Sequence, residues 1–253
     1  MGGTFSPDDG NASPLLAVHA FYTAARRAGR GVPLQRARRP AIITGGRPRP
    51  RRPHGQGRAT PPPVVVNAAG AVGAPRSAAL AGLDVPVRPD SPRGGGDRSR
   101  RAASSSPWSS TSGRSPGSAN YYFYQHDTGQ IVFCITPEPQ HLGHGHARDE
   151  LVPADGRRAA WSDLMPRLRN LRVRRTWRGL YPMTPDGFPI VGWTRELEGY
   201  MLAVGMCGQG FMLGPGLGEL IARMVVGRET EDDRETLSYL SPYREFKGQE
   251  KLK

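Results

Sequence analysis

The stretch that decides the fold is GYMLAVGMCGQGFMLGPGLGELIARMVVG, residues 199–227. It opens with an apolar run at 201–204 that has the composition of a buried strand. A glycine-rich segment follows, and Gly227 stands where helices commonly end on a residue of positive φ. Between them, apolar side chains recur with the spacing of one helix face, at Leu217, Leu220, Ile221, Met224 and Val225. The stretch therefore predicts a strand, a glycine loop and a helix in succession.

Such a strand, loop and helix would leave backbone N–H groups unpaired at the start of the helix. The positive end of the helix dipole lies at the same place, so the site suits a phosphate or another electron-rich group. Glycines in the loop would let the backbone approach a flat ligand closely, because they carry no Cβ atom. The stretch is thus a candidate binding site for an anion or an electron-rich ring.

Three further segments make a family resemblance specific. TPDGFPIVG (184–192) followed by the stretch above resembles the C-terminal signature of the D-amino acid oxidase superfamily. Within it, the sequence is most similar to sarcosine oxidase beta subunits, dimethylglycine dehydrogenase and related FAD-dependent amine dehydrogenases. VVVNAAGA (64–71) resembles the family's strand and turn that return to the FAD, and residues 2–29 resemble the segment before it.

The resemblance implies an α/β (α+β) fold, with a Rossmann-like FAD-binding domain and an antiparallel-sheet substrate domain. The family begins with a βαβ unit that carries G-x-G-x-x-G, and no such unit precedes Gly2. We therefore expect an N-terminally truncated chain whose FAD-binding domain is incomplete. Because that motif holds the pyrophosphate, we expect this chain to bind FAD weakly or not at all.

Composition divides the chain into blocks. We expect residues 1–90 to be part of the FAD-binding domain, with 30–63 irregular. Residues 91–192 would form the substrate domain, with 92–116 and 141–162 irregular, and residues 117–139 would form two strands around a turn at 127–129. Residues 193–230 would complete the FAD-binding domain, and 231–253 would be a tail.

The irregular blocks are rich in Arg, Pro and Ser and interrupt the family-like segments abruptly. One interpretation is a disordered linker. The other is a compensated frameshift in a GC-rich gene, because a legal back-translation of Pro107–Arg114, read one nucleotide earlier, encodes Pro-Met-Val-Val-Asp-Ile-Arg-Pro, a plausible strand. The nucleotide sequence would decide between the two.

The resemblance assigns the flavin to two glycine-containing segments and one turn. A helix N-terminus there would stabilise negative charge on the reduced flavin. Asp186 has a second interpretation as a plain turn residue, and residues 67–70 as small residues that allow close helix packing. The expected FAD-binding residues are Asn67, Ala68, Ala69, Gly70, Asp186, Gly205, Gly208, Gln209, Gly210, Phe211 and Met212.

For the substrate, Tyr122, Tyr124 and Tyr181 are candidates to line a pocket, or else half-buried strand residues. No catalytic residue can be named. Relatives carry a flavin-linking cysteine where this chain has Gly179, so we expect FAD to be non-covalent there. Relatives also place a basic residue where this chain has Tyr181 or Met212. The resemblance therefore does not identify the residue that would bind a substrate carboxylate in this chain.

Charge and cysteine content limit the other functions. The net charge is +13 over 253 residues, but nearly all basic residues are arginine and no aromatics are interleaved for base stacking. We therefore expect no nucleic-acid partner. Two distant cysteines form no disulfide framework, and no apolar run is long enough for a membrane span, so we expect a cytoplasmic protein. The motif H-x-x-H-x-H at 141–146 is not expected to bind metal.

The sequence thus indicates an FAD-dependent oxidoreductase that oxidises the C–N bond of a secondary or tertiary amino acid, such as sarcosine, dimethylglycine or proline. Its expected partner is a small-molecule amine substrate, and a homo- or hetero-oligomer is possible. Two alternatives stay open: a non-catalytic remnant or interaction fragment, and a basic nucleic-acid-binding protein.

Overall fold

The computed structural model describes residues 10, 12–32, 44–45, 47–48, 64–90, 93–97, 111–115, 118–126, 129–137, 166 and 173–248. The chain divides into two units, residues 1–39 and 40–253. The first unit contains helix α1 (Pro14–Arg27), which has proline at its first position and Ser13 as its N-cap. The Ser13 hydroxyl accepts a hydrogen bond from the Leu16 amide at 3.4 Å, as expected for a serine cap.

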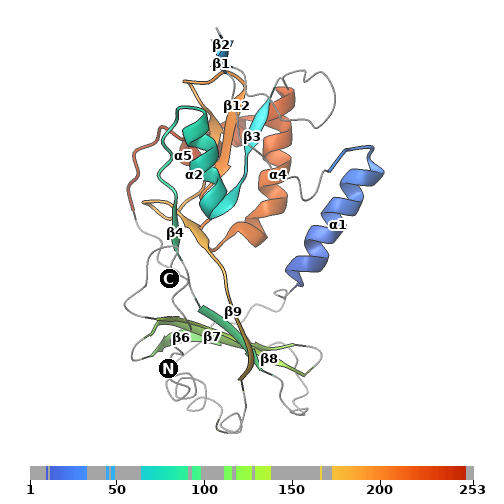
Figure 1. Cartoon of the computed structure of the whole chain (residues 1–253), viewed down its shortest axis with the longest axis vertical. Coiled ribbons are helices and arrows are strands. Elements are labelled where there is room, and N and C mark those ends of the chain that lie inside the picture. Colours follow the sequence, from blue (N-terminus) through green and yellow to red (C-terminus); the bar gives the residue numbers. More distant parts are fainter. Residues whose placement is uncertain are drawn as a thin grey trace. The chain divides into compact units, whose positions relative to one another are not determined.

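The second unit is organised around a three-stranded sheet (Figure 1). Its strands are β11 (Ile190–Trp193), β12 (Tyr200–Val204) and β3 (Val65–Asn67), in that spatial order. β12 pairs with β11 antiparallel and with β3 parallel. β12 is the central strand and all five of its residues are buried, which confirms the buried strand predicted at 201–204.

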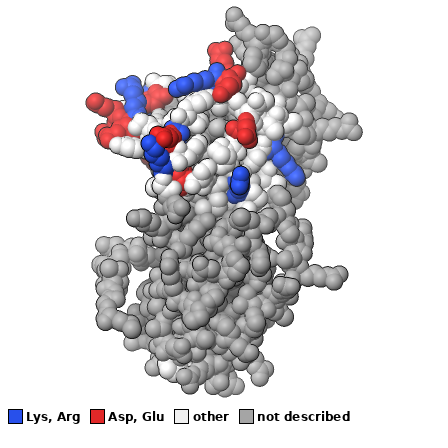
Figure 2. All heavy atoms as spheres, turned by 90° about the vertical axis from the view of Figure 1, so that its left-hand side faces the viewer, with Lys and Arg blue, Asp and Glu red and all other residues white. Residues whose placement is uncertain are grey.

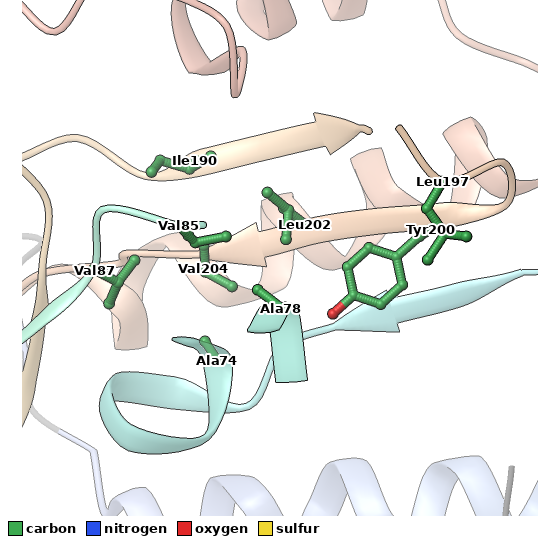
Figure 3. Close-up of a cluster of buried hydrophobic side chains, with 9 residues drawn as sticks. All are labelled: Ala74, Ala78, Val85, Val87, Ile190, Leu197, Tyr200, Leu202 and Val204. Atoms are coloured by element: carbon green, nitrogen blue, oxygen red, sulfur yellow. The ribbon is translucent and has the colours of Figure 1, made fainter. Parts of the chain in front are cut away.

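Helices cover both faces of this sheet. Figure 3 shows one face, where Ala74 and Ala78 of α2 (Gly70–Leu80) point toward Leu202 and Val204 of β12. The other face carries Val191 and Met201, which pack against α4 (Gly210–Val226) and α5 (Glu231–Leu240). Residues 201 and 202 therefore lie on opposite sides, because side chains alternate along a strand.

Helix α4 confirms the helix predicted from apolar spacing. Leu220 and Met224 are buried in the core, and Leu217 and Ile221 pack against it. Val225, which the same spacing placed on this face, is 41% exposed, so the buried stripe is narrower than predicted. The helix ends at Gly227, whose φ of 67° confirms the left-handed C-terminal glycine.

Helix α5 lies in the segment that the sequence analysis described as a tail. Its N-cap Thr230 and Asp233 form a capping box, in which each side chain accepts from the other residue's amide. Both Asp233 oxygens also accept hydrogen bonds from Arg223 of α4, each at 2.7 Å. These hydrogen bonds lower the pKa of Asp233, and the pair fixes α5 to the end of α4.

The remaining strands form antiparallel pairs. A five-stranded sheet has the order β6-β7-β8-β5-β9. The β7–β8 hairpin confirms the two strands expected around 127–129, and β5 and β6 lie within 92–116, where irregular structure was expected. The strand bounds are β5 (Arg93–Asp97), β6 (Thr111–Ser115), β7 (Ser118–Gln125), β8 (Ile131–Pro137), β9 (Val173–Arg178), β4 (Arg88–Asp90) with β10 (Tyr181–Met183), and β1 (Thr44–Gly45) with β2 (Arg47–Pro48). The mixed α/β class is confirmed.

Among the described residues on the face drawn in Figure 2, acidic and basic side chains are mixed. This part of the surface is therefore neither uniformly positive nor uniformly negative. No helix within the described ranges is long and apolar enough to cross a bilayer. The described residues also contain no cluster of three or more metal-ligating side chains. The histidines at 141, 144 and 146, and most of the blocks 30–63 and 141–162, lie outside the described residues.

Leu202 provides a test of the layered core, because its side chain is 4% exposed and packs in the cluster between the sheet and α2. Leu202→Ala should lower the free energy of unfolding by about 2–5 kcal/mol, through lost burial and the cavity left behind. Urea denaturation measures this. Val226→Ala is the control, since Val226 is 63% exposed and should change stability by less than about 0.5 kcal/mol. Equal effects would contradict the assigned core.

Candidate active site

Two helices begin at the same edge of the central sheet. β3 and β12 run parallel, with Asn67 opposite Leu202, so their carboxyl ends meet at one edge. α2 begins at Gly70, shortly after β3, and α4 begins at Gly210, after the loop 205–209 that follows β12. In open α/β sheets, ligands bind at the carboxyl ends of parallel strands. This edge is therefore the candidate site.

The starts of these two helices lack side-chain caps. Ala69 and Gln209 occupy the N-cap positions, and neither makes a side-chain capping bond. Neither helix has an acidic residue in its first turn. The other two described helices are capped, by Ser13 and Thr230. The two helix starts at the sheet edge thus keep backbone N–H groups and an uncompensated positive dipole for an external acceptor.

The loop 205–209 packs on the segment around β10. Gly205 has φ of 71°, and a Cβ atom there would lie 2.2 Å from Thr184 Cγ2. The amide of Cys207 donates to the carbonyl of Pro182 at 3.2 Å. Cys207 is buried and has φ of 48°, a left-handed conformation that is uncommon outside glycine. The loop is therefore shaped by close contact with residues 181–184.

Neighbouring residues of the chain also constrain these glycines, which we expect to allow close approach of a flavin ring. A Cβ atom on Gly205 would clash with Thr184, whereas a Cβ atom on Gly208 would lie 3.3 Å from the Tyr181 ring and one on Gly210 would lie 3.0 Å from Met206 Cβ. Packing within the chain therefore excludes a side chain at Gly205 and leaves little room for one at Gly208 and Gly210.

The first turn of α4 is open to solvent. Phe211 is 52% exposed and Met212 is 69% exposed, although both are large and apolar. Gly208 is exposed as well, while Gln209 and Gly210 are partly buried. Apolar side chains beside unpaired amides are the usual lining of a small-molecule site, where a few polar groups give orientation.

Asn67 joins the end of β3 to helix α2. Its side-chain amide donates to the carbonyl of Ala74 at 2.9 Å, and its oxygen accepts from the Ala69 amide at 3.3 Å. Asn67 is buried, whereas Ala68, Ala69 and Gly70 are exposed. Gly70 has φ of 68°, which favours glycine at this position. The buried asparagine therefore shapes the turn, and the three small residues after it are the accessible ones.

Asp186 is enclosed by its own chain. Its oxygens accept hydrogen bonds from Arg244 at 2.8 and 2.9 Å and from the Phe188 amide at 3.2 Å. Burial raises the pKa of Asp186, but the hydrogen bonds and charge of Arg244, together with the bonds from Phe188 and Thr184, bring the pKa below its usual value. These contacts support its interpretation as a turn residue.

The three candidate substrate tyrosines separate into two groups. Tyr181 of β10 lies against the loop, with its ring next to Gly208. Tyr122 and Tyr124 belong to β7 of the five-stranded sheet, where both are half-buried and share one face. Phe123, between them, is buried, and burial raises the pKa of Tyr124. Tyr181 is the candidate that the structure brings to the loop.

Sequence reasoning missed two residues at this site, Thr184 and Arg244. Thr184 is buried, and its hydroxyl lies 2.8 Å from the Phe188 carbonyl oxygen and 3.6 Å from Cys207 Sγ. Arg244 reaches Asp186 across 58 positions of sequence. The threonine belongs to the recognised TPDG segment and could have been considered, but no local pattern marks the arginine.

The packing of the loop can be tested at Gly205. Gly205→Ala should lower the free energy of unfolding by about 2–4 kcal/mol, since it adds backbone strain to the clash with Thr184. Gly218→Ala is the matched control, because a Cβ atom there meets nothing within 4 Å and alanine favours a helix by about 0.5–1 kcal/mol. Guanidinium denaturation of both variants would show the difference, and an unchanged Gly205 variant would contradict the loop geometry.

Two curated proteins are similar in sequence to part of this chain. The chain is 32% identical over 104 residues to hydrogen cyanide synthase subunit HcnC of Pseudomonas aeruginosa, which covers 41% of this chain and 24% of that protein. It is 28% identical over 112 residues to glycine oxidase of Bacillus subtilis, covering 44% and 30%. The matched regions thus span less than a third of these relatives.

Solved structures are similar over a larger part of the chain. The L-proline dehydrogenase of P. horikoshii has a TM-score of 0.57 at 27% identity, covering 72% of this chain and 46% of that chain. The glycine oxidase of Geobacillus kaustophilus has a TM-score of 0.57 at 26% identity, covering 74% and 47%. The chain therefore spans about half the length of these enzymes.

A family model gives the widest match. The model described as "DAO: FAD dependent oxidoreductase" matches residues 1–224, which include β3, β12 and nearly all of α4. This match confirms the resemblance drawn from the sequence, and FAD, bound non-covalently, is the cofactor of such enzymes. The chain belongs to the DAO family of FAD-dependent oxidoreductases.

Proposed function

We propose that this chain supplies the flavin-edge part of an enzyme that oxidises the C–N bond of a secondary or tertiary amino acid. The observation that carries the proposal is the meeting of two uncapped helix starts at the carboxyl ends of two adjacent parallel strands. The proposed FAD-binding residues are the accessible turn 68–70 and the segment 208–212. Asn67, Asp186 and Gly205 would shape these segments from behind.

The residues at this edge fit an FAD. The amides at the start of α4 offer donors without a competing carboxylate, because neither Gln209 nor a first-turn acid caps the helix. Gly208 is exposed, and Phe211 and Met212 present apolar surface beside the donors. This combination of donors and apolar surface suits a flat ring that has polar edges and gains negative charge on reduction.

When bound, FAD would accept a hydride from the carbon next to the substrate nitrogen. The chain's own contribution would be electrostatic: the α4 amides would stabilise negative charge that develops at the neighbouring ring edge. They would be held in place before the reaction by the contacts of Cys207 with Pro182 and of Gly205 with Thr184. No side chain within the described residues is assigned as a general base.

The substrate class is supported by the similar proteins and by Tyr181. One solved relative is an L-proline dehydrogenase, whose name specifies a secondary amine; another is a glycine oxidase, which supports an amino-acid substrate but not the secondary or tertiary nitrogen. Tyr181 lies beside Gly208 and is partly exposed, and we propose that its ring lines a small substrate pocket. We propose sarcosine, dimethylglycine or proline as the substrates to test first.

Gly210→Val tests the proposed role of the α4 amides. The Cβ at this position meets Met206 at 3.0 Å, so a branched side chain would displace the loop from the helix start. Losing one aligned donor should slow substrate reduction of bound flavin roughly 30- to 1,000-fold, equivalent to about 2–4 kcal/mol. The measurement is anaerobic bleaching of flavin absorbance after mixing with each candidate substrate, at saturating FAD.

The control is Gly218→Val, which makes the same change further along α4, where a Cβ atom meets nothing within 4 Å. Its reduction rate should stay within about threefold of the parent. Equal rates in the two variants would show that the helix start does not serve the flavin. A chain that binds no FAD at any concentration would favour the non-catalytic remnant instead.

A further inference from the structure

The C-terminal segment 241–246 runs along β11 and contacts both turns that flank this strand. After β11, the Tyr243 hydroxyl accepts a hydrogen bond from the Arg195 amide at 2.6 Å and donates to Glu196. Within β11, a Cβ atom on Gly192 would lie 2.7 Å from Pro242 Cδ, so the segment lies directly against the strand. Pro242 and Tyr243 thus hold the segment against β11 and against the turn that follows this strand.

Before β11, the contact is made by Arg244. Its guanidinium binds both oxygens of Asp186, at 2.8 and 2.9 Å, and donates to the Phe188 carbonyl at 3.0 Å. The Arg244 side chain is 9% exposed and that of Asp186 is 4% exposed. A fork-shaped guanidinium satisfies a buried carboxylate and a carbonyl together, which a lysine ammonium cannot match in geometry.

Thr184 connects this ion pair to the glycine loop. Its hydroxyl lies 3.2 Å from Asp186 Oδ1 and 3.6 Å from Cys207 Sγ. Its methyl group fills the space beside Gly205. Cys207 in turn lies with its Sγ 3.3 Å from the Gly205 carbonyl. A continuous set of contacts thus runs from Arg244 through Asp186 and Thr184 to the loop that precedes α4.

We propose that Arg244 is a positioning residue, which fixes the turn 184–188 and through Thr184 holds the loop 205–209 in the conformation that aims the α4 amides. The consequence for the flavin rests on the function proposed above, but the contacts from Arg244 to Cys207 do not. Removing one partner of a buried ion pair leaves the other charge uncompensated, so the turn would rearrange. The loop would then lose the surface on which it packs.

The chain contains a matched control for this inference. Arg223 and Asp233 form a second bidentate pair at 2.7 Å, which joins α4 to α5 at the other end of the helix. Arg223→Gln and Arg244→Gln therefore remove the same kind of interaction. The Arg223 side chain is more exposed, at 38%, so the free energy of unfolding of each variant is measured as well. If Arg244 acts only on general stability, the labelling of Cys207 in both variants should follow the loss of unfolding free energy. If it positions the loop, only Arg244→Gln should affect residues 205–209.

Cys207 reports on the loop without any cofactor. In the full chain with Cys134→Ser, Cys207 is the remaining cysteine, and it is 4% exposed. Its rate of labelling by a maleimide, in native buffer, should rise at least tenfold in Arg244→Gln and in Asp186→Asn. Arg223→Gln should stay within twofold of the parent. Arg244→Lys should fall between, because it keeps the charge and loses the fork.

Equal labelling of the Arg244→Gln and Arg223→Gln variants, or an unchanged rate in Arg244→Gln, would overturn the inference. Should Arg244→Gln not fold, Arg244→Lys and Asp186→Asn carry the same comparison. With FAD added, the absorbance difference spectrum of bound flavin should change in Arg244→Gln and not in Arg223→Gln. Flavin that binds the parent without contacting the start of α4 would overturn the proposed function, while the labelling rates would still decide this inference.

Discussion

The parallel pairing of β12 with β3 is the constraint on which the site depends. Their register, with Asn67 opposite Leu202, brings two carboxyl ends to one edge of the sheet. Because each strand is followed by a short connection and a helix, the starts of α2 and α4 lie at that edge. A shift of one residue in register would also exchange the two faces of β12, and both of its buried sides would lose their partners.

The layers around the sheet explain how this edge stays in place without capped helices. α2 is held by alanines that allow close approach to Leu202 and Val204 (Figure 3). α4 is held by Leu220 and Met224 and by its ion pair with Asp233 at the far end. The stabilising contacts of α4 thus lie in its second half, and its first turn is left free of caps and burial for a ligand.

Much of the fold could be predicted from local patterns. The apolar run at 201–204, the helical spacing after Gly214 and the left-handed Gly227 each depend on near neighbours in sequence, and each appears as predicted. The family resemblance added the FAD. Helix α5 was missed because its first residues are acidic and its apolar face is narrow, although Thr230 and Asp233 have the spacing of a capping box.

The details of the site are harder to predict from the sequence, because they depend on contacts between segments that are distant in the chain. No spacing rule pairs Arg244 with Asp186, or places Thr184 beside Gly205. The sequence therefore indicates a ligand beside the loop glycines but does not reveal the neighbours from the same chain that lie against them. It also does not separate Tyr181 of β10 from Tyr122 and Tyr124, which both belong to β7 of another sheet.

The most direct measurement of the central claim is amide hydrogen exchange with and without saturating FAD. The account predicts slower exchange on FAD addition in two separate segments, 68–71 and 208–213, with no change in α5. This pattern would link both helix starts to one ligand. Protection confined to other segments, or no protection at either helix start while FAD is bound, would contradict the assignment of this sheet edge to the flavin.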